Sequence, residues 1–196
     1  MCRVLTVAIT VFANAGIVEK VNFYEEHKGG SGSLPPPLDS VVLDINLKSV
    51  VTTSYLALHF FRQNKVPGGN LVITASSGGL YPTAYLPMYA AAKHGCVGFS
   101  RSVAEGLAGS GIRVNCICPG TVATGLLKKE EWEKFPQETF TPVEKVAEAV
   151  LMLVENGKLN GQSVELVQDR LHLRAPPEPL DPALKKMMSK DVGFRE

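Results

Sequence analysis

Residues 70–75 read NLVITA, a short apolar run that stands between a Pro-Gly-Gly turn and a loop rich in serine and glycine. Such a run is typical of a strand that is covered on both faces of a sheet. Pro87 can open the next helix at its first turn, and an alanine-rich apolar pattern continues to residue 107. Residues 112–118, IRVNCIC, then predict a second strand. A strand, a crossover helix and another strand indicate parallel pairing, so this stretch selects an α/β fold.

The same alternation extends in both directions along the chain. Residues 4–12 predict an earlier strand, and residues 39–63 predict a long helix with Asp39 as its N-cap. The stretch TPVE at residues 141–144 predicts a capping box that opens a helix ending near residue 155. Residues 162–167 predict the last strand.

These elements predict a Rossmann-like, doubly wound parallel sheet in one domain. The domain is expected to cover residues 1–168, and residues 169–196, which lack a periodic pattern, are expected to form an irregular tail. The charged residues 128–134 predict a solvated helix face or a mobile lid.

Composition limits the classes of function. The chain has 196 residues, 45% apolar content and a formal net charge of +1, which is typical of one globular domain and gives no basic surplus for nucleic acid. No transmembrane span is expected. The cysteines and histidines do not cluster with metal-ligand spacing, so no metal site is predicted. They are Cys2, Cys96, Cys116, Cys118, His27, His59, His94 and His172.

Residues 1–16, MCRVLTVAITVFANAG, have two interpretations. An early arginine, an apolar stretch and the Ala-x-Ala sequence at residues 13–15 imitate a secretory signal peptide with its cleavage site. The alternative is a buried strand followed by a loop, because the β-branched content suits a parallel sheet.

The stretch MYAAAKHG, residues 88–95, places Tyr89 and Lys93 one turn apart on a helix face. A phenol has an ordinary pKa of about 10, and a nearby ammonium group lowers that pKa by favouring the phenolate. The pair could therefore exchange a proton with an alcohol or carbonyl oxygen. The spacing alone is common by chance.

Ser76 and Ser77 strengthen the catalytic interpretation. They follow the strand at residues 70–75, at the carboxyl edge of the sheet, where open α/β folds bind their ligands. A hydroxyl group there can hydrogen-bond the same substrate oxygen as Tyr89. Chemistry alone does not choose between the two serines.

Together these residues resemble the short-chain dehydrogenases/reductases. The Ser and Tyr-x-x-x-Lys arrangement of that family matches Ser76, Tyr89 and Lys93, and its serine-to-tyrosine interval favours Ser76 over Ser77. Its Asn-Ala-Gly element matches residues 14–16, its helix asparagine matches Asn46 in DINLK, and its strand and turn before the nicotinamide match residues 113–124. The resemblance covers about residues 4–167, and it favours the Asn-Ala-Gly turn over the signal peptide and a cytoplasmic location over secretion.

The resemblance implies a reaction and a role for each residue. Hydride would pass between NAD(P) and a secondary alcohol or ketone. Tyr89 would be the general acid/base, Lys93 would lower its pKa and bind the nicotinamide ribose, and Ser76 would position the reacting oxygen. Asn46 would hold the water that links Lys93 to solvent. The residues that would contact the cofactor are Asn14, Ala15, Gly16, Tyr89, Lys93, Pro119, Gly120, Val122 and Thr124.

Within the family, the sequence looks most like the NAD-dependent 15-hydroxyprostaglandin dehydrogenase branch, which slightly favours NAD over NADP. The matching stretches are residues 89–102, 115–120 and 159–161. They leave the substrate open beyond a small-molecule alcohol or ketone, since substrate loops vary most.

The sequence departs from the family at its start. The family opens with a strand and a Gly-rich turn that holds the pyrophosphate at a helix N-terminus, and no such turn follows a strand here. With the strand order 3-2-1-4-5-6-7, the chain would keep strands four to seven and lack the first three. The strand at residues 4–12 would then be an exposed edge, and cofactor binding by this truncated chain would be weak.

Two functions therefore follow from the resemblance. One is an NAD(P)-dependent oxidoreductase with a truncated cofactor site, and the other is a non-catalytic dimerisation module. In this family the two long helices, here residues 39–63 and 87–107, commonly form the interface of a homo-oligomer.

Overall fold

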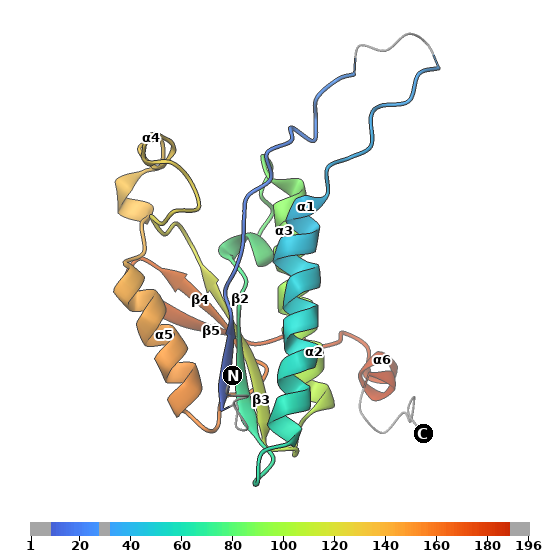
Figure 1. Ribbon diagram of the computed structural model, residues 1–196. Coiled ribbons are helices and arrows are strands. Elements are labelled where there is room, and N and C mark those ends of the chain that lie inside the picture. The colour runs from blue at the N-terminus through green and yellow to red at the C-terminus, as the bar shows by residue number, and fades with distance from the viewer. Residues whose placement is uncertain (1–8, 28–31, 189–196) are drawn as a thin grey trace, which may run out of the picture.

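The computed structural model describes residues 9–27 and 32–188, which form a five-stranded sheet flanked by helices (Figure 1). The first four strands pair in parallel, and the fifth is antiparallel to the fourth. In spatial order they are β1 Thr10–Ala13, β2 Gly69–Thr74, β3 Ile112–Pro119, β4 Ser163–Val167 and β5 Arg170–Arg174. The predicted parallel α/β sheet is confirmed, and β2 to β4 match their predicted ranges closely.

Helices cover both faces of the sheet. Helices α2 (Ser49–Arg62) and α3 (Pro87–Gly106) lie on one face, and α5 (Val143–Glu155) lies on the other (Figure 1). Successive side chains of a strand point to opposite faces, so Leu71 and Ile73 join one core with α2 and α3, while Val72 joins the other with α5. A parallel strand buried on both faces has to be apolar throughout, which explains the run NLVITA.

The helix predicted over residues 39–63 is not a regular α-helix. A short helix α1 (Val41–Leu43) is followed by the π-helical turn η1 (Asp44–Lys48) and then by α2. Asp39 does accept a hydrogen bond from the Val41 amide (3.0 Å). The π-helical turn contains Asn46, whose side chain is fully buried, and such turns often occur at functional sites.

The expectation of an irregular tail is wrong for part of it. Residues 170–174 form β5, which pairs along its length with β4, and α6 (Pro182–Met187) follows with Asp181 as its N-cap. The sequence RLHLR places polar and apolar residues on an edge strand that is exposed throughout. Pairing with a neighbour, rather than burial, therefore fixes this strand.

The predicted capping box at residues 141–144 is also wrong. No side chain caps α5, which begins after Pro142. Thr141 is buried, and its hydroxyl group accepts a hydrogen bond from the Gln168 amide (3.0 Å) instead. The charged segment at residues 128–134 contains α4 (Lys129–Trp132).

Strand β1 begins at Thr10, and residues 4–8 of the predicted first strand lie outside the described residues. Among the described strands β1 pairs with β2 alone. Its other edge carries no described strand, so β1 is an edge strand of the sheet as described.

One helical run in the described part of the chain, Val41–Arg62, has the length and apolar composition of a membrane span. Its buried side chains Val50, Ala57 and Phe61 belong to the core between helix and sheet. The expectation that no segment spans a membrane stays a prediction.

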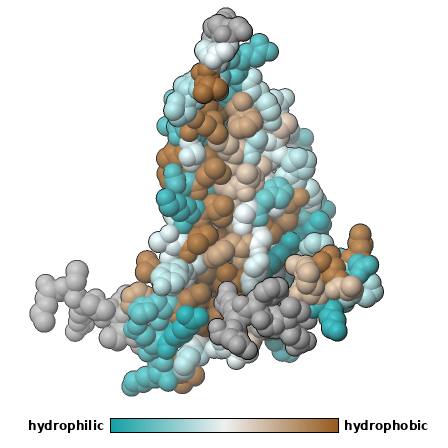
Figure 2. All heavy atoms as spheres, turned by 90° about the vertical axis from the view of Figure 1, so that its right-hand side faces the viewer, coloured by the Kyte–Doolittle hydropathy of each residue, from teal (hydrophilic) through white to brown (hydrophobic). Residues whose placement is uncertain are grey.

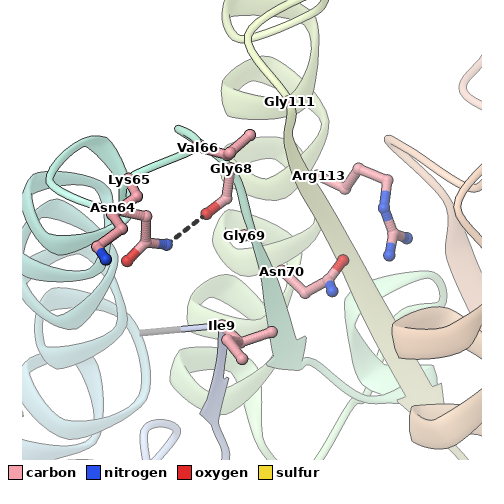
Figure 3. Close-up of a pocket in the computed structure, with 9 residues that line it drawn as sticks. All are labelled: Ile9, Asn64, Lys65, Val66, Gly68, Gly69, Asn70, Gly111 and Arg113. Carbon is pink, nitrogen blue, oxygen red and sulfur yellow. Dashed lines mark hydrogen bonds between the residues drawn. The ribbon is translucent and has the colours of Figure 1, made fainter. Parts of the chain in front are cut away.

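Arg113 joins β3 to the end of α5 from the edge of a cavity of about 530 Å³ (Figure 3). One guanidinium nitrogen donates to the carbonyl groups of Leu153 (2.8 Å) and Asn156 (2.9 Å), and the other donates to that of Val154 (2.8 Å). The carbonyl groups of Leu153 and Val154 lie in the last turn of α5 and have no intrahelical partner, and a cation is favourable at this end of a helix. This cavity lies at the amino ends of β2 and β3, away from the predicted catalytic residues.

We expect Arg113→Lys to lower the free energy of unfolding by about 1.5–3 kcal/mol, because an ammonium group cannot reproduce the planar fork of donors. Chemical denaturation monitored by circular dichroism measures this loss. Lys158→Met, which removes an exposed cation near the same helix end, is the control and should change stability little. Equal stability of Arg113→Lys and the parent chain would contradict the prediction.

Candidate active site

The predicted site residues meet at the carboxyl edge of the sheet. They line one cavity of about 740 Å³, formed where β2 and β3 end and α3 begins. All predicted catalytic and cofactor residues except Asn46 line it: Asn14, Ala15, Gly16, Ser76, Tyr89, Lys93, Pro119, Gly120, Val122 and Thr124.

Ser76 follows β2 and caps the short helix η2 (Ser77–Gly79). Its hydroxyl oxygen accepts a hydrogen bond from the Gly78 amide (3.1 Å), and hydrogen bonding from the same side chain lowers the pKa of the Tyr89 phenol. Ser77 lines the cavity as well, and no such bond to Tyr89 is found for it. The geometry therefore favours Ser76, as the family interval did.

Tyr89 and Lys93 lie one turn apart on α3 and both reach the cavity. The ammonium group of Lys93 is 5.6 Å from the centre of the Tyr89 ring and donates to the carbonyl group of Thr74 (2.9 Å). Only 3% of Lys93 is exposed. A buried ammonium group needs such acceptors, so the end of β2 fixes where this charge lies.

Burial is the largest influence on the pKa values of Tyr89 and Lys93. It raises the pKa of the Tyr89 phenol above its ordinary value, and the hydrogen bond to Ser76 opposes that rise. Burial also lowers the pKa of Lys93. The pKa of Tyr89 is thus raised overall, because burial disfavours the phenolate, and the lowering expected from Lys93 stays a prediction.

Asn46 lies behind the cavity, and its side chain is engaged by the backbone of Ile17. Its amide nitrogen donates to the Ile17 carbonyl (2.7 Å), and its side-chain oxygen accepts from the Ile17 amide (2.8 Å). The backbone carbonyl of Asn46 accepts from the thiol of Cys96 (3.1 Å). Asn46 thus holds the segment after Asn14-Ala15-Gly16, and a role in holding water stays a prediction.

Two close approaches depend on glycine. A Cβ atom on Gly79 would lie 2.6 Å from the carbonyl oxygen of Lys93, so only glycine lets η2 lie against α3. A Cβ atom on Gly16 would lie 3.3 Å from the side-chain oxygen of Asn46 and 3.5 Å from the ammonium nitrogen of Lys93. Both glycines keep the backbone next to catalytic side chains.

The remaining walls of the cavity are apolar on one side and polar on the other. Trp132 donates to the carbonyl group of Thr124 (2.9 Å) and packs against Phe135, beside Leu126 and Leu127. The lining also contains the buried Glu165, which raises the pKa of Tyr81 and whose carboxylate lies 3.5 Å from the guanidinium group of Arg174 in β5.

Sequence reasoning missed three of these contacts. The carbonyl group of Thr74, the Tyr81 and Glu165 pair, and Glu19, which hydrogen-bonds the Tyr89 amide, belong to no recognised motif. Their partners lie far away in the sequence, so no local pattern could have indicated them.

No group of three or more metal-ligating side chains occurs within residues 9–27 and 32–188. Cys96, Cys116 and Cys118 are free and buried, whereas Cys2 lies outside the described residues.

The cavity fits the nicotinamide half of a dinucleotide better than the phosphate half. The backbone leaves little room at Gly16 and Gly120, and a Cβ atom on Gly120 would lie 3.3 Å from the Leu166 carbonyl oxygen. Lys93 offers a hydrogen-bond donor beside Gly16. A flat ring and a ribose suit such walls. The sequence has no Gly-rich turn that opens a helix, so it offers no matching cradle for the pyrophosphate.

Comparisons with known proteins agree with this geometry. The sequence profile of the short chain dehydrogenase family matches residues 8–134. The short-chain dehydrogenase/reductase prx7 of Penicillium rubens is 48% identical over 159 residues, which is 79% of this chain and 56% of prx7. Human 15-hydroxyprostaglandin dehydrogenase [NAD(+)] is 46% identical over 95 residues, which is 47% of this chain and 36% of that enzyme.

Solved structures agree as well. Levodione reductase matches with a TM-score of 0.66 and 27% identity, covering 82% of this chain and 66% of that one. The chain thus spans little more than half the length of its first curated relative. Because the family profile covers most of the chain and the sheet, the Ser-Tyr-Lys site and the overall structure all agree with it, the chain belongs to the short-chain dehydrogenase/reductase family.

Proposed function

We propose that this chain carries the catalytic half of an NAD(P)-dependent oxidoreductase that interconverts a secondary alcohol and a ketone by hydride transfer. One observation supports the proposal most directly: Ser76, Tyr89 and Lys93 meet in one cavity with the predicted nicotinamide residues. The hydrogen bond between Ser76 and Tyr89 leaves both hydroxyl groups in position for one substrate oxygen.

The nicotinamide supplies or accepts the hydride when it is bound. Tyr89 donates its phenolic proton to the carbonyl oxygen of a ketone, or accepts the proton of an alcohol in the reverse direction. Ser76 donates a hydrogen bond to the same oxygen and fixes its position. Lys93, held by the Thr74 carbonyl group, places a positive charge beside Tyr89 that stabilises the phenolate when it forms.

The cofactor would be NAD or NADP, with NAD slightly favoured. The human relative is named as NAD(+)-dependent, whereas a structural relative, an actinorhodin polyketide ketoreductase of 25% identity, was solved with NADPH. We propose that the parallel strands β1 to β4 correspond to strands four to seven of the family's sheet. The free edge of β1 is then where the strands that carry the phosphate-binding turn would pair.

Hydride transfer can be tested by fusing to this chain the segment of Penicillium rubens prx7 that precedes the matched region. We expect the fusion to reduce nicotinamide with secondary alcohols, followed by absorbance of the reduced cofactor. Tyr89→Phe should lower kcat/KM by about 10²- to 10⁴-fold, since it removes the acid/base group. Tyr24→Phe, at an exposed tyrosine that does not line the cavity, is the matched control. A folded fusion that neither binds nor reduces nicotinamide would rule out the proposal.

Burial also predicts the pH dependence of Tyr89. The pKa of the Tyr89 phenol is raised above its ordinary value of about 10. The protonated, proton-donating form therefore predominates at neutral pH. Ketone reduction should then be flat with pH until the phenol ionises, whereas alcohol oxidation should rise with pH because it consumes the phenolate. Phenolate absorbance of the parent chain minus that of Tyr89→Phe measures the midpoint, and a midpoint at or below the ordinary value would contradict this prediction.

A second candidate function is dimerisation through the long helices. Large apolar side chains stand exposed on α2, with 74% of Tyr55, 51% of Leu56 and 41% of Phe60 accessible to solvent. Figure 2, which faces the side of α2 and α3 in Figure 1, shows hydrophobic residues gathered in a band along this face. An apolar band of this kind is typical of an interface, and we propose that a second copy of the chain covers it.

We expect a dimer in size-exclusion chromatography with light scattering. Leu56→Asp should shift it to a monomer, because the carboxylate would be buried without a partner. The control Val66→Asp changes an exposed apolar residue in the turn after α2 and should leave the dimer intact. A parent chain that stays monomeric at all concentrations, or that floats with neutral lipid vesicles, would refute dimerisation through this face.

A further inference from the structure

Residues 14–19, which we call the strap, follow β1 and form hydrogen bonds with Thr74, Asn46 and the backbone of Tyr89. Asn14 accepts a hydrogen bond from the hydroxyl group of Thr74 (2.8 Å), the residue whose carbonyl group binds Lys93. Ile17 exchanges two hydrogen bonds with the Asn46 side chain. Glu19 ends the strap, and its carboxylate accepts a hydrogen bond from the Tyr89 amide (2.5 Å).

The hydrogen bond from the Tyr89 amide to Glu19 takes the place of a local N-cap bond, which α3 lacks. Leu86 occupies the N-cap position of α3, and its side chain makes no hydrogen bond to the first turn. The opening amide groups of a helix need an acceptor, and a negative charge is favourable at that end. Glu19 supplies both from seventy residues away in the sequence.

The environment of Glu19 is unusual for a glutamate. Only 8% of it is exposed, and its second carboxylate oxygen is buried with no hydrogen-bond partner among the described residues. A buried carboxylate is costly unless a specific interaction compensates. The interaction that the structure offers is the bond to Tyr89 at the N-terminus of α3.

We propose that Glu19 is a positioning residue, which holds Tyr89 in the cavity by tying the strap to the first turn of α3. The role of Tyr89 as acid/base rests on the proposed function, but the contact itself does not. The strap also presents Asn14, Ala15 and Gly16 to the same cavity. One carboxylate therefore couples the position of the predicted cofactor segment to that of the predicted proton donor.

The test compares Glu19→Ala with Glu19→Gln. The alanine variant loses the acceptor, so exchange of the Tyr89 amide proton measured by NMR should accelerate about tenfold, with faster exchange at Ile17. The phenol titration of Tyr89, observed with ring-labelled tyrosine and assigned with Tyr89→Phe, should move toward its ordinary pKa as the ring gains solvent. Glu19→Gln keeps an acceptor oxygen and should restore both signals.

Two further variants separate positioning from general stability. Glu25→Ala changes an exposed glutamate of the same loop and should alter neither signal. In the double variant Glu19→Ala with Leu86→Asp, the new local cap should protect the Tyr89 amide again and support the fold. The strap should stay released, and the phenol titration of Tyr89 should stay shifted.

The inference is overturned if Glu19→Ala leaves both signals unchanged, or if Glu19→Gln behaves like Glu19→Ala. It is also overturned if the local cap at position 86 restores the strap and the titration together, because Glu19 would then be only a helix cap. None of these measurements needs nicotinamide. Failure of hydride transfer in the fusion would therefore remove the proposed function, and the exchange rates would still decide whether Glu19 positions Tyr89.

Discussion

The parallel pairing of β2 with β3 is the constraint on which the site depends. The register continues beyond β2, where the Ala75 amide donates to the carbonyl group of Ile117 (2.8 Å), so both strands end at the same edge. Ser76 leaves one strand there and Pro119 ends the other. Parallel strands gather their carboxyl ends at one edge, and the crossover helix α3 has to start beside it. Because α3 starts at this edge, Tyr89 and Lys93 in its first two turns lie beside the ends of β2 and β3.

Charge burial then determines the chemistry available at this edge. Lys93 is buried and Tyr89 is partly buried at the cavity wall, where burial disfavours both the ammonium and the phenolate form. The protein offsets this cost locally, through the Thr74 carbonyl group for Lys93 and the Ser76 hydroxyl group for Tyr89. The raised pKa therefore keeps the phenol in its protonated form at neutral pH, and in the proposed reaction this form is the one that donates a proton to a ketone oxygen.

The strap shows how one segment can align side chains from different elements. Asn46 comes from a π-helical turn, Thr74 from the end of β2 and Tyr89 from α3, and residues 14–19 bond to all three. The bonds to Asn46 and to the Tyr89 amide involve partly buried polar groups that would be costly to leave without a partner. Misplacing the strap would leave several such groups unsatisfied at once, which favours a single arrangement of the site.

Local patterns in the amino-acid sequence were enough to predict the strands β2 to β4, the long helices and the Tyr89 and Lys93 pair, because periodicity and motif spacing are local, whereas the choice of Ser76 over Ser77 came from the family resemblance. They did not reveal β5, which is exposed and exists only by pairing with β4. They also missed the π-helical turn at Asn46 and the hydrogen bond from the Tyr89 amide to Glu19. They did not indicate that the Thr141 hydroxyl group accepts from the Gln168 amide instead of capping α5. Most of these features join residues far apart in the chain. Folding selects them, because a buried polar group takes the partner that the tertiary structure brings near, and no local pattern records which partner that is.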